Sequence, residues 1–375
     1  MFTRVETTWR NRERSMRRRF PRTFLTAVVL FVAAVPSVRA ISYYLAIDVP
    51  ATLGGVDRTP DQILRSDDAT YSIALALGAP DTQFGALHRR PDGIWLLASS
   101  TPFFLGATPV QPHDVVSYDG VTFSVYFNGG AAGIPDGVRV DALFLDTGGN
   151  LILSFDVPVN LGGVEYAPSD LVRYSGGVFS LYWSAAAAGV PAYANVVGAD
   201  QDSAGALVVS FDVPTNLGGI EFMPGQLARW KGGTFFSGYF TDPVWPAYAE
   251  LRDFSFVPAS GAVPDGSGAT APLNLKVSGG DLILSWGSSC ATTDTDYEIY
   301  EGALVQPFAY DHTEKLCTTG GATTASFAAP AGSAYYLVVP KNGVSEGSYG
   351  RASSGTEIPR GTAACLPQQI AAACP

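Results

Sequence analysis

The chain repeats itself with a period of 56 residues, and this repeat restricts its fold more than any other feature of the sequence. The segment FDVPVNLGGVEYAPSDLVRYSGGVFSLYW, which starts at Phe155, recurs as FDVPTNLGGIEFMPGQLARWKGGTFFSGYF from Phe211. The same offset places a more divergent copy around Ser100, and a fourth copy starts with IDVPATLGGV at Ile47. Repeats of this length indicate an array of similar structural units that share one core.

Each copy is predicted to form four short strands. In the third copy they cover residues 140–146, 151–157, 170–174 and 178–183. Short turns such as DTGGN and SGG join the first strand to the second and the third to the fourth, with glycine supplying the positive φ that a tight hairpin needs. Longer segments with Pro and Gly join the second strand to the third, and one copy to the next. Four antiparallel strands per repeat are typical of a propeller blade.

The two ends of the repeat region complement each other. The first copy begins at its second strand, residues 43–49, and lacks a first strand. After the fourth copy, PAYAELRDFSFVP at 246–258 is similar to the first-strand segment PAYANVVGADQ at 191–201. We predict that residues 251–256 pair beside 43–49 and close a ring of four units. The alternative is an open linear array, which would need polar end caps rather than a borrowed strand.

In repeat length and strand count, residues 41–257 resemble four-bladed β-propellers, although the WD, Kelch and hemopexin signatures are absent. The resemblance implies an all-β fold for this region and no particular activity.

A second β domain is expected after the repeats. The segments LNLKVSGGDLILSW, DYEIYEG and AYYLVVPKNGVSEGSYG within residues 273–358 resemble strands of a fibronectin type III module, with Trp286, Tyr297, Tyr300, Tyr335 and Tyr336 at core positions. The resemblance implies a β-sandwich in which these aromatic side chains pack inside. Residues 258–272, PASGAVPDGSGATAP, are expected to form a linker, and residues 359–375 a tail.

Four cysteines, Cys290, Cys317, Cys365 and Cys374, lie in this second part of the chain. In an exported protein an even number of cysteines indicates disulfides, here two with three possible pairings. The spacing favours a Cys290–Cys317 bridge, which would contribute about 3 to 4 kcal/mol by loop closure. Cys365 would then pair with Cys374.

Residues 1–40 have the three parts of an export signal: an arginine-rich start, an apolar run at 24–35 and a small-residue exit before Ile41. The alternative, a retained membrane anchor, is disfavoured because this run is too short to span about 30 Å as a helix. Removing the segment leaves 14 basic and 32 acidic side chains, a net charge of −18. Such a charge repels nucleic acid and anionic lipid. We therefore expect a secreted monomer, extracellular or periplasmic, with no nucleic-acid partner.

Opposite charges recur together on neighbouring strands. The predicted pairs are Asp48 with Arg65, Asp156 with Arg173, and Asp212 with Arg229, whereas the second copy has Ser100 and Ser117 in their place. Charges that are gained and lost together indicate cross-strand ion pairs that stabilise the units. Asp57, Glu165 and Glu221 follow the same pattern and are alternative partners.

The long segments between second and third strands should share a face with the crossings between copies, and such loops on a rigid scaffold commonly bind ligands. The candidate binding residues there are Asn160, Glu165, Tyr166, Asn216, Glu221 and Phe222, a mixture suited to a sugar or a protein surface. Alternatively, these segments only turn corners.

No catalytic motif is present, so no catalytic residue, cofactor or metal is expected. His88, His113 and His312 lack partners at metal-binding spacing, and HExxH, CxxC, phosphate-loop and GxSxG patterns are missing. The run Asp200, Asp202, Ser203 offers oxygens to calcium, but a hairpin turn is the favoured interpretation. The leading hypothesis is a non-enzymatic module that recognises a protein or glycan. The alternatives are a polysaccharide hydrolase or lyase that uses loop carboxylates, and a purely structural surface component.

Overall fold

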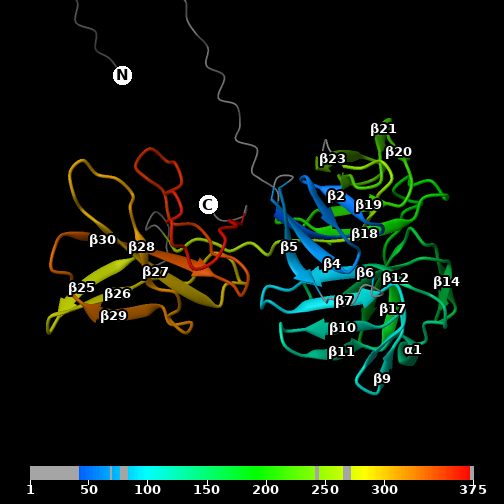
Figure 1. Ribbon diagram of the computed structural model, residues 1–375, viewed down its shortest axis with the longest axis horizontal. Coiled ribbons are helices and arrows are strands. Elements are labelled where there is room, and N and C mark those ends of the chain that lie inside the picture. Colours follow the sequence, from blue (N-terminus) through cyan, green and yellow to red (C-terminus); the bar gives the residue numbers. More distant parts are fainter. Residues whose placement is uncertain (1–41, 68–69, 77–82, 241–244, 265–271, 372–375) are drawn as a thin grey trace, which may run out of the picture. The chain divides into compact units, whose positions relative to one another are not determined.

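The computed structural model describes residues 42–67, 70–76, 83–240, 245–264 and 272–371. These residues are almost all in strands, turns and irregular segments, with one short helix, α1 (Gly129–Ala132) (Figure 1). Within the described ranges, no helix has the length and apolar character needed to cross a membrane. The predicted export signal, residues 1–40, lies outside these ranges.

Four antiparallel sheets of four strands each account for the repeats (Figure 1). The first sheet runs β24 (Leu251–Phe256), β1 (Ser42–Ile47), β4 (Gln62–Asp67), β5 (Thr70–Ala76). The second runs β6 (Phe84–Arg89), β7 (Trp95–Ser99), β10 (Val115–Tyr118), β11 (Phe123–Phe127). The third runs β12 (Val140–Leu145), β13 (Leu151–Phe155), β16 (Leu171–Ser175), β17 (Val178–Trp183). The fourth runs β18 (Val196–Gln201), β19 (Leu207–Phe211), β22 (Leu227–Trp230), β23 (Phe236–Phe240). One sheet thus corresponds to one copy, and the four strands predicted for the third copy are confirmed.

Strand β24 supplies the strand that the first copy lacks. It pairs antiparallel with β1, with Tyr43 opposite Phe256 and Leu45 opposite Phe254. The predicted pairing of these two segments is therefore confirmed. The register of the β24–β1 pairing shifts near the start of β24. The same shift occurs near the start of β12 in its pairing with β13, and near the start of β18 in its pairing with β19. Strand β24 consequently has the structural position of a first strand, although it comes last in the repeat region.

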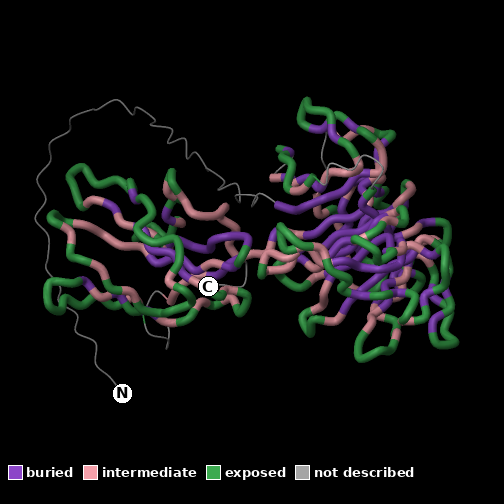
Figure 2. The backbone as a smooth tube through the Cα atoms, turned by 60° about the horizontal axis from the view of Figure 1, so that its bottom comes forward, coloured by how far each residue is buried: buried purple, intermediate pink, exposed green. Residues whose placement is uncertain are grey.

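The first strands of the four sheets contact one another in cyclic order: β6 with β12, β12 with β18, β18 with β24, and β24 with β6. They are buried along most of their length, as the purple tube in the interior of this region shows (Figure 2). Their close approach requires small residues. A Cβ atom added to Gly198 of β18 would lie 3.0 Å from Phe254 Cδ1 and 3.2 Å from Asp253 Cα of β24.

Neighbouring sheets pack face to face through apolar side chains. Between the third and fourth sheets, Phe144 and Trp183 share one buried cluster with Phe211 and Phe236. Because each sheet buries side chains against its neighbours, a single copy of the repeat would expose much of its core.

Each copy also contains a two-stranded hairpin between its second and third long strands. The strands are β2 (Ala51–Leu53) with β3 (Val56–Arg58), β8 (Phe103–Leu105) with β9 (Thr108–Val110), β14 (Val159–Leu161) with β15 (Val164–Tyr166), and β20 (Thr215–Leu217) with β21 (Ile220–Phe222). At the turn between β14 and β15, Gly162 and Gly163 have φ of 62° and 86°. Two consecutive residues with positive φ are what a two-residue hairpin turn requires. These segments, predicted as open loops, are therefore ordered hairpins.

The C-terminal region contains two three-stranded sheets. One consists of β25 (Asn274–Ser278), β26 (Asp281–Ser285) and β29 (Thr324–Ala328), and the other of β28 (Thr313–Leu316), β27 (Asp296–Ala303) and β30 (Ala334–Lys341). Trp286 and Tyr297 are buried in the cluster that the two sheets share. Tyr300 is buried in a second cluster, whereas Tyr335 and Tyr336 are half-buried.

The disulfide pairing differs from the prediction. Cys317 is bonded to Cys365, so the predicted Cys290–Cys317 and Cys365–Cys374 bridges are wrong. Cys290 is also disulfide-bonded, and Cys374 lies outside the described residues. The physical reason is that the tail folds back onto the C-terminal sheet of β28, β27 and β30. There the backbone N–H of Cys365 donates to the hydroxyl of Tyr300, on β27, at 3.0 Å. This return brings Cys365 beside Cys317 at the end of β28, which sequence spacing could not reveal.

Part of the predicted linker is bonded to the C-terminal region. Ser260 is fully buried, and its hydroxyl donates to the carbonyl of Ser345 at 3.1 Å. The backbone N–H of Gly261 donates to Asp294 Oδ2 at 2.8 Å. The linker prediction is thus wrong for this stretch, and residues 265–271 lie outside the described ranges.

Candidate functional site

The acidic residues that follow the second strands bind backbone groups. Asp156 Oδ1 accepts from Arg139 N at 2.7 Å, and Asp212 Oδ1 accepts from Asn195 N at 2.8 Å. In the first sheet, Asp48 Oδ1 accepts from Glu250 N at 2.6 Å. Each carboxylate therefore fixes the entry of a first strand beside its second strand, and the predicted cross-strand ion pairs with the third-strand arginines are wrong.

The third-strand arginines pair instead with acidic residues at the short-turn ends of the strands. The Nε atoms of Arg65, Arg173 and Arg229 lie 2.9, 3.0 and 2.7 Å from carboxylate oxygens of Asp67, Asp146 and Asp202, respectively. Register explains the difference, because Arg173 lies opposite Ile152. Asp156 is four residues further along, which is about 13 Å in an extended strand. The alternative partners Asp57, Glu165 and Glu221 are exposed on the added hairpins.

The predicted binding residues divide into two groups. Asn160 and Asn216 are exposed and shape the hairpin turns, since their Oδ1 atoms accept from Gly163 N and Gly219 N, both at 3.2 Å. Glu165 and Glu221 lie opposite them and are also exposed. Tyr166 and Phe222 are only 2% exposed and anchor the hairpins in the core, so the prediction that they project from the surface is wrong. Whether the four exposed residues bind anything stays a prediction.

One buried carboxylate lies where the first strands of the four sheets meet. Asp253 Oδ2 accepts from the backbone N–H groups of Leu87 and Leu143 at 2.8 and 3.2 Å. Its Oδ1 accepts from Ala199 N and from Phe254 N at 3.3 and 2.8 Å. Three of these donors come from the other three sheets. Burial raises the pKa of Asp253 well above its usual range, because the charged form has lost its water.

A second buried group joins three strands through Asp200, Ser255 and His88. The Ser255 hydroxyl donates to Asp200 Oδ2 at 3.2 Å and lies 3.3 Å from His88 Nδ1. Burial raises the pKa of Asp200 to about 7 and lowers that of His88 to about 3. A hydrolytic triad places histidine between serine and the acid, whereas here serine lies between the other two. The serine is also fully buried, so this group serves the packing of the strands.

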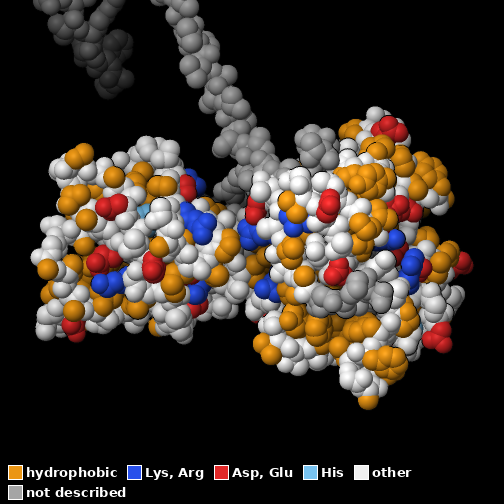
Figure 3. Space-filling model, in the orientation of Figure 1, with side chains coloured by type: hydrophobic (Ala, Val, Ile, Leu, Met, Phe, Trp, Pro, Cys, Tyr) orange, Lys and Arg blue, Asp and Glu red, His pale blue; other side chains and the backbone are white. Residues whose placement is uncertain are grey.

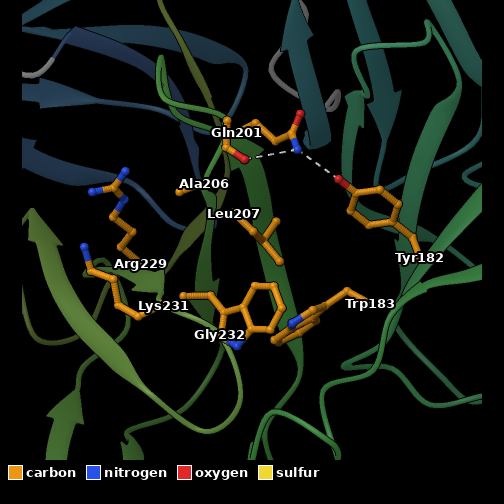
Figure 4. Close-up of a pocket in the computed structure, with 10 residues that line it drawn as sticks. Tyr182, Trp183, Gln201, Ala206, Leu207, Arg229, Lys231 and Gly232 are labelled. Carbon is orange, nitrogen blue, oxygen red and sulfur yellow. Dashed lines mark hydrogen bonds between the residues drawn. The ribbon is translucent and has the colours of Figure 1, made fainter. Parts of the chain in front are cut away.

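A cavity of about 660 Å³ opens between the third and fourth sheets (Figure 4). The outer strand β17 contributes Tyr182 and Trp183, and the fourth sheet contributes Gln201 together with residues 205–207 and 229–232. In the close-up, Arg229 and Lys231 lie on one side of the cavity, and Tyr182 and Trp183 lie on the other.

The cavity lies at the end of the fourth sheet that carries the short turns. Residues 205 and 206 belong to the turn between β18 and β19, Leu207 begins β19, and residues 231–232 belong to the turn between β22 and β23. In an antiparallel sheet these turns are at the end opposite the β20–β21 hairpin. None of the predicted binding residues lines the cavity. The sequence does hold a signal for it, because Arg229-Trp230-Lys231 replaces the Arg-Tyr-Ser and Ser-Tyr-Asp of the third and second copies.

Two tryptophans form the apolar part of the lining. Their rings meet edge to face with centroids 6.1 Å apart. The indole N–H of Trp230 donates to the carbonyl of Gly233 at 2.9 Å. Trp183 is only 6% exposed, and its indole N–H has no hydrogen-bond partner within the described part of the chain. A buried donor without an acceptor is uncommon in folded proteins and often marks a place where a ligand or water binds.

The polar part of the lining is rich in donors. The amide Nε2 of Gln201 donates to the hydroxyl of Tyr182 at 2.9 Å, which the dashed line in Figure 4 marks. Arg229 is neutralised by Asp202. The ammonium group of Lys231 has no acidic partner among the residues that the structure describes. None of the described lining residues is an aspartate or a glutamate, and the described ranges contain no cluster of three or more His, Cys, Asp or Glu side chains suited to a metal.

Comparisons with known proteins found no matching family model and no similar curated protein. Among solved structures, virginiamycin B lyase from Staphylococcus aureus is similar over 60% of this chain and 71% of its own, with 12% identity and a TM-score of 0.24. The extracellular domain of a putative hybrid two component system from B. thetaiotaomicron is similar over 87% of this chain and 56% of its own, with 8% identity and a TM-score of 0.28. Both are β-propeller-like proteins, and at these TM-scores neither indicates a ligand or an activity.

Proposed function

We propose that residues 41–257 form a closed four-bladed β-propeller that acts as a recognition module, with its ligand in the cavity between the third and fourth sheets. Three observations support the closed ring: one four-stranded sheet per copy, the cyclic contacts of the first strands, and the pairing of β24 with β1. A scaffold of this kind holds its inter-sheet surfaces rigidly, which favours a preformed site.

The single observation that carries the binding function is the cavity itself. It combines indole rings with an unpaired buried N–H and an unpaired ammonium group, all held on strands or on short turns. The buried indole N–H without an acceptor in the described chain and the exposed ammonium group of Lys231 support a ligand site at this place. We place the ligand here rather than on the hairpin face because Tyr166 and Phe222, the aromatic members of that predicted site, are buried.

A polysaccharide hydrolase or lyase is the alternative function. Glycoside hydrolysis uses a pair of carboxyl groups on either side of the scissile bond. Among the described residues the cavity lining contains no carboxylate, and the carboxylate of Asp202 beside it is already paired with Arg229. This composition favours binding without turnover.

We further propose that residues 273–358 form a fibronectin type III-like sandwich. Its first, second and fifth strands make one sheet, and its third, fourth and sixth make the other, which is the sheet composition of that module without its last strand. The Cys317–Cys365 bridge is compatible with an oxidising compartment, so we propose that the chain is exported, with residues 1–40 as its signal.

A glycan array probed with residues 41–375 tests the function, with a matched pair of variants. Ala206→Phe would fill the cavity, because Ala206 lines it, whereas Ala204→Phe changes an exposed residue of the same turn that does not line it. We expect the first variant to lose binding and the second to keep it, with both melting within a few degrees of the parent. Equal binding by both variants would move the site elsewhere. Release of product from a polysaccharide panel would favour the hydrolase or lyase.

A further inference from the structure

The charge of the cavity is opposite to that of the protein. The chain has 34 acidic and 23 basic residues, and the face shown in Figure 3 carries both signs interspersed. The part of the cavity lining that the structure describes has, in contrast, two cations and no carboxylate. At the position of Lys231 the third, second and first copies have Ser175, Asp119 and Asp67, so this ammonium group is confined to one of the four sheets.

The two cations are not equivalent. The guanidinium of Arg229 is held by Asp202 at 2.7 Å and lies 5.9 Å from the ring centroid of Tyr239. Lys231 alone is available to a ligand. A phosphate would favour two-pronged recognition by a free arginine, whereas a single ammonium group suits a singly charged carboxylate.

The indole N–H of Trp183 adds a second, directional contact. The equivalent residues of the second and fourth sheets are Phe127 and Phe240, so the fold accepts a phenylalanine ring at this position. Packing therefore does not explain the nitrogen of Trp183. The nitrogen itself is buried, so a ligand hydroxyl or ring oxygen in the cavity would satisfy this donor once the Trp183 ring turns its N–H edge toward the cavity.

Size and shape agree with a sugar. Ligand cavities commonly measure about 300 to 1,000 Å³, and a cavity of about 660 Å³ accommodates one or two sugar rings. Trp230 offers an aromatic surface for the apolar face of such a ring, and Gln201 offers an amide for its hydroxyl groups.

We propose that the cavity binds an acidic carbohydrate, a uronic acid residue of an oligosaccharide. Its carboxylate binds Lys231, an oxygen accepts from the indole N–H of Trp183, and its ring packs on Trp230. This assignment rests on the proposed recognition function and specifies the ligand class of the same site.

Calorimetric titration of residues 41–375 with digalacturonate and with its uncharged counterpart, galactobiose, tests the assignment. We expect digalacturonate to bind at least tenfold more tightly, and the difference to shrink as salt is added. Lys231→Ser, which introduces the residue of the third copy, should weaken digalacturonate about tenfold and leave galactobiose unchanged. Lys276→Ser removes the same charge from an exposed position on β25 and should change neither.

Trp183→Phe provides the second arm. It should weaken both sugars about tenfold while the melting temperature stays within a few degrees of the parent, because phenylalanine occupies this position in two other sheets. Equal affinity for the two sugars, unchanged by Lys231→Ser, would overturn the acidic ligand and leave the recognition function intact. Absence of binding to both sugars together with an empty glycan array would overturn both proposals.

Discussion

Replacing Asp253 by asparagine should destabilise the repeat region strongly, although the two side chains have nearly the same size. The Asp253 carboxylate is fully buried and accepts four backbone N–H groups, three of which belong to the other three sheets. It therefore connects the first strands of all four sheets through one side chain.

The magnitude follows from these hydrogen bonds. Asparagine keeps one oxygen, but its NH₂ group would face two N–H donors that then have no acceptor. Each unpaired buried donor costs about 1 to 3 kcal/mol, so the loss is about 2 to 6 kcal/mol. The lower half of this range is expected, because burial raises the pKa of Asp253 and the neutral amide avoids part of the cost of burying a charge. Such a loss is large against a typical domain stability of about 5 to 15 kcal/mol.

Urea unfolding of residues 41–375, followed by circular dichroism and tryptophan fluorescence, measures this change. Asp281→Asn makes the same replacement at an exposed position of β26 and should leave stability within about 0.5 kcal/mol. If Asp253→Asn were as stable as this control, the carboxylate would not hold the first strands together and our account of the ring would be refuted.

Three further outcomes are expected. Burial raises the pKa of Asp200 to about 7, so the stability that Asp200 contributes is fully present below about pH 4 and falls by about 4 kcal/mol as the pH rises to 7. Asp200→Asn has no proton to lose, so its free energy of unfolding should fall by about 4 kcal/mol less than that of the parent over this window. Burial raises the pKa of Glu298 to about 8, and so does the neighbouring Glu346, which accepts a hydrogen bond from the protonated form of Glu298. The parent should therefore lose stability relative to Glu298→Gln as the pH rises from about 4.5 to about 8, and a constant difference between the two over this window would contradict this. Replacing both Cys317 and Cys365 by alanine opens a bridge that spans 48 residues and should cost about 4 kcal/mol, whereas peptide mapping that finds Cys317 bonded to Cys290 would contradict the structure.

The sequence predicted strands well where the repeat supplied several versions of one pattern. Strands β12, β13, β16 and β17 were predicted within two residues, and the role of β24 followed from counting strands at the two ends. The small hairpins were missed because three-residue strands carry little periodicity. Their signal was the pair Gly162-Gly163 between alternating residues, which is a known mark of a two-residue turn.

The candidate site could not be predicted in the same way. The repeat directed attention to residues shared by the third and fourth copies, such as Asn160 and Asn216, and shared residues here shape the fold. The groups that lack partners, Trp183 and Lys231, are those in which one copy departs from the others. Departures from a repeat are therefore the better guide to a ligand site in this chain.

The sequence by itself determined the all-β class, the number of repeated units and the strand that completes the first sheet, because these depend on local patterns and on comparison of one copy with the next. Only the tertiary structure decided which acid meets which arginine, which cysteines bond, and where a cavity opens. The physical reason is register: a carboxylate at one end of a strand is about 13 Å from a partner four residues away, and only the folded sheets show which ends meet. The site unites the outer strand of one sheet with two turns of the next, a neighbourhood that no single copy contains.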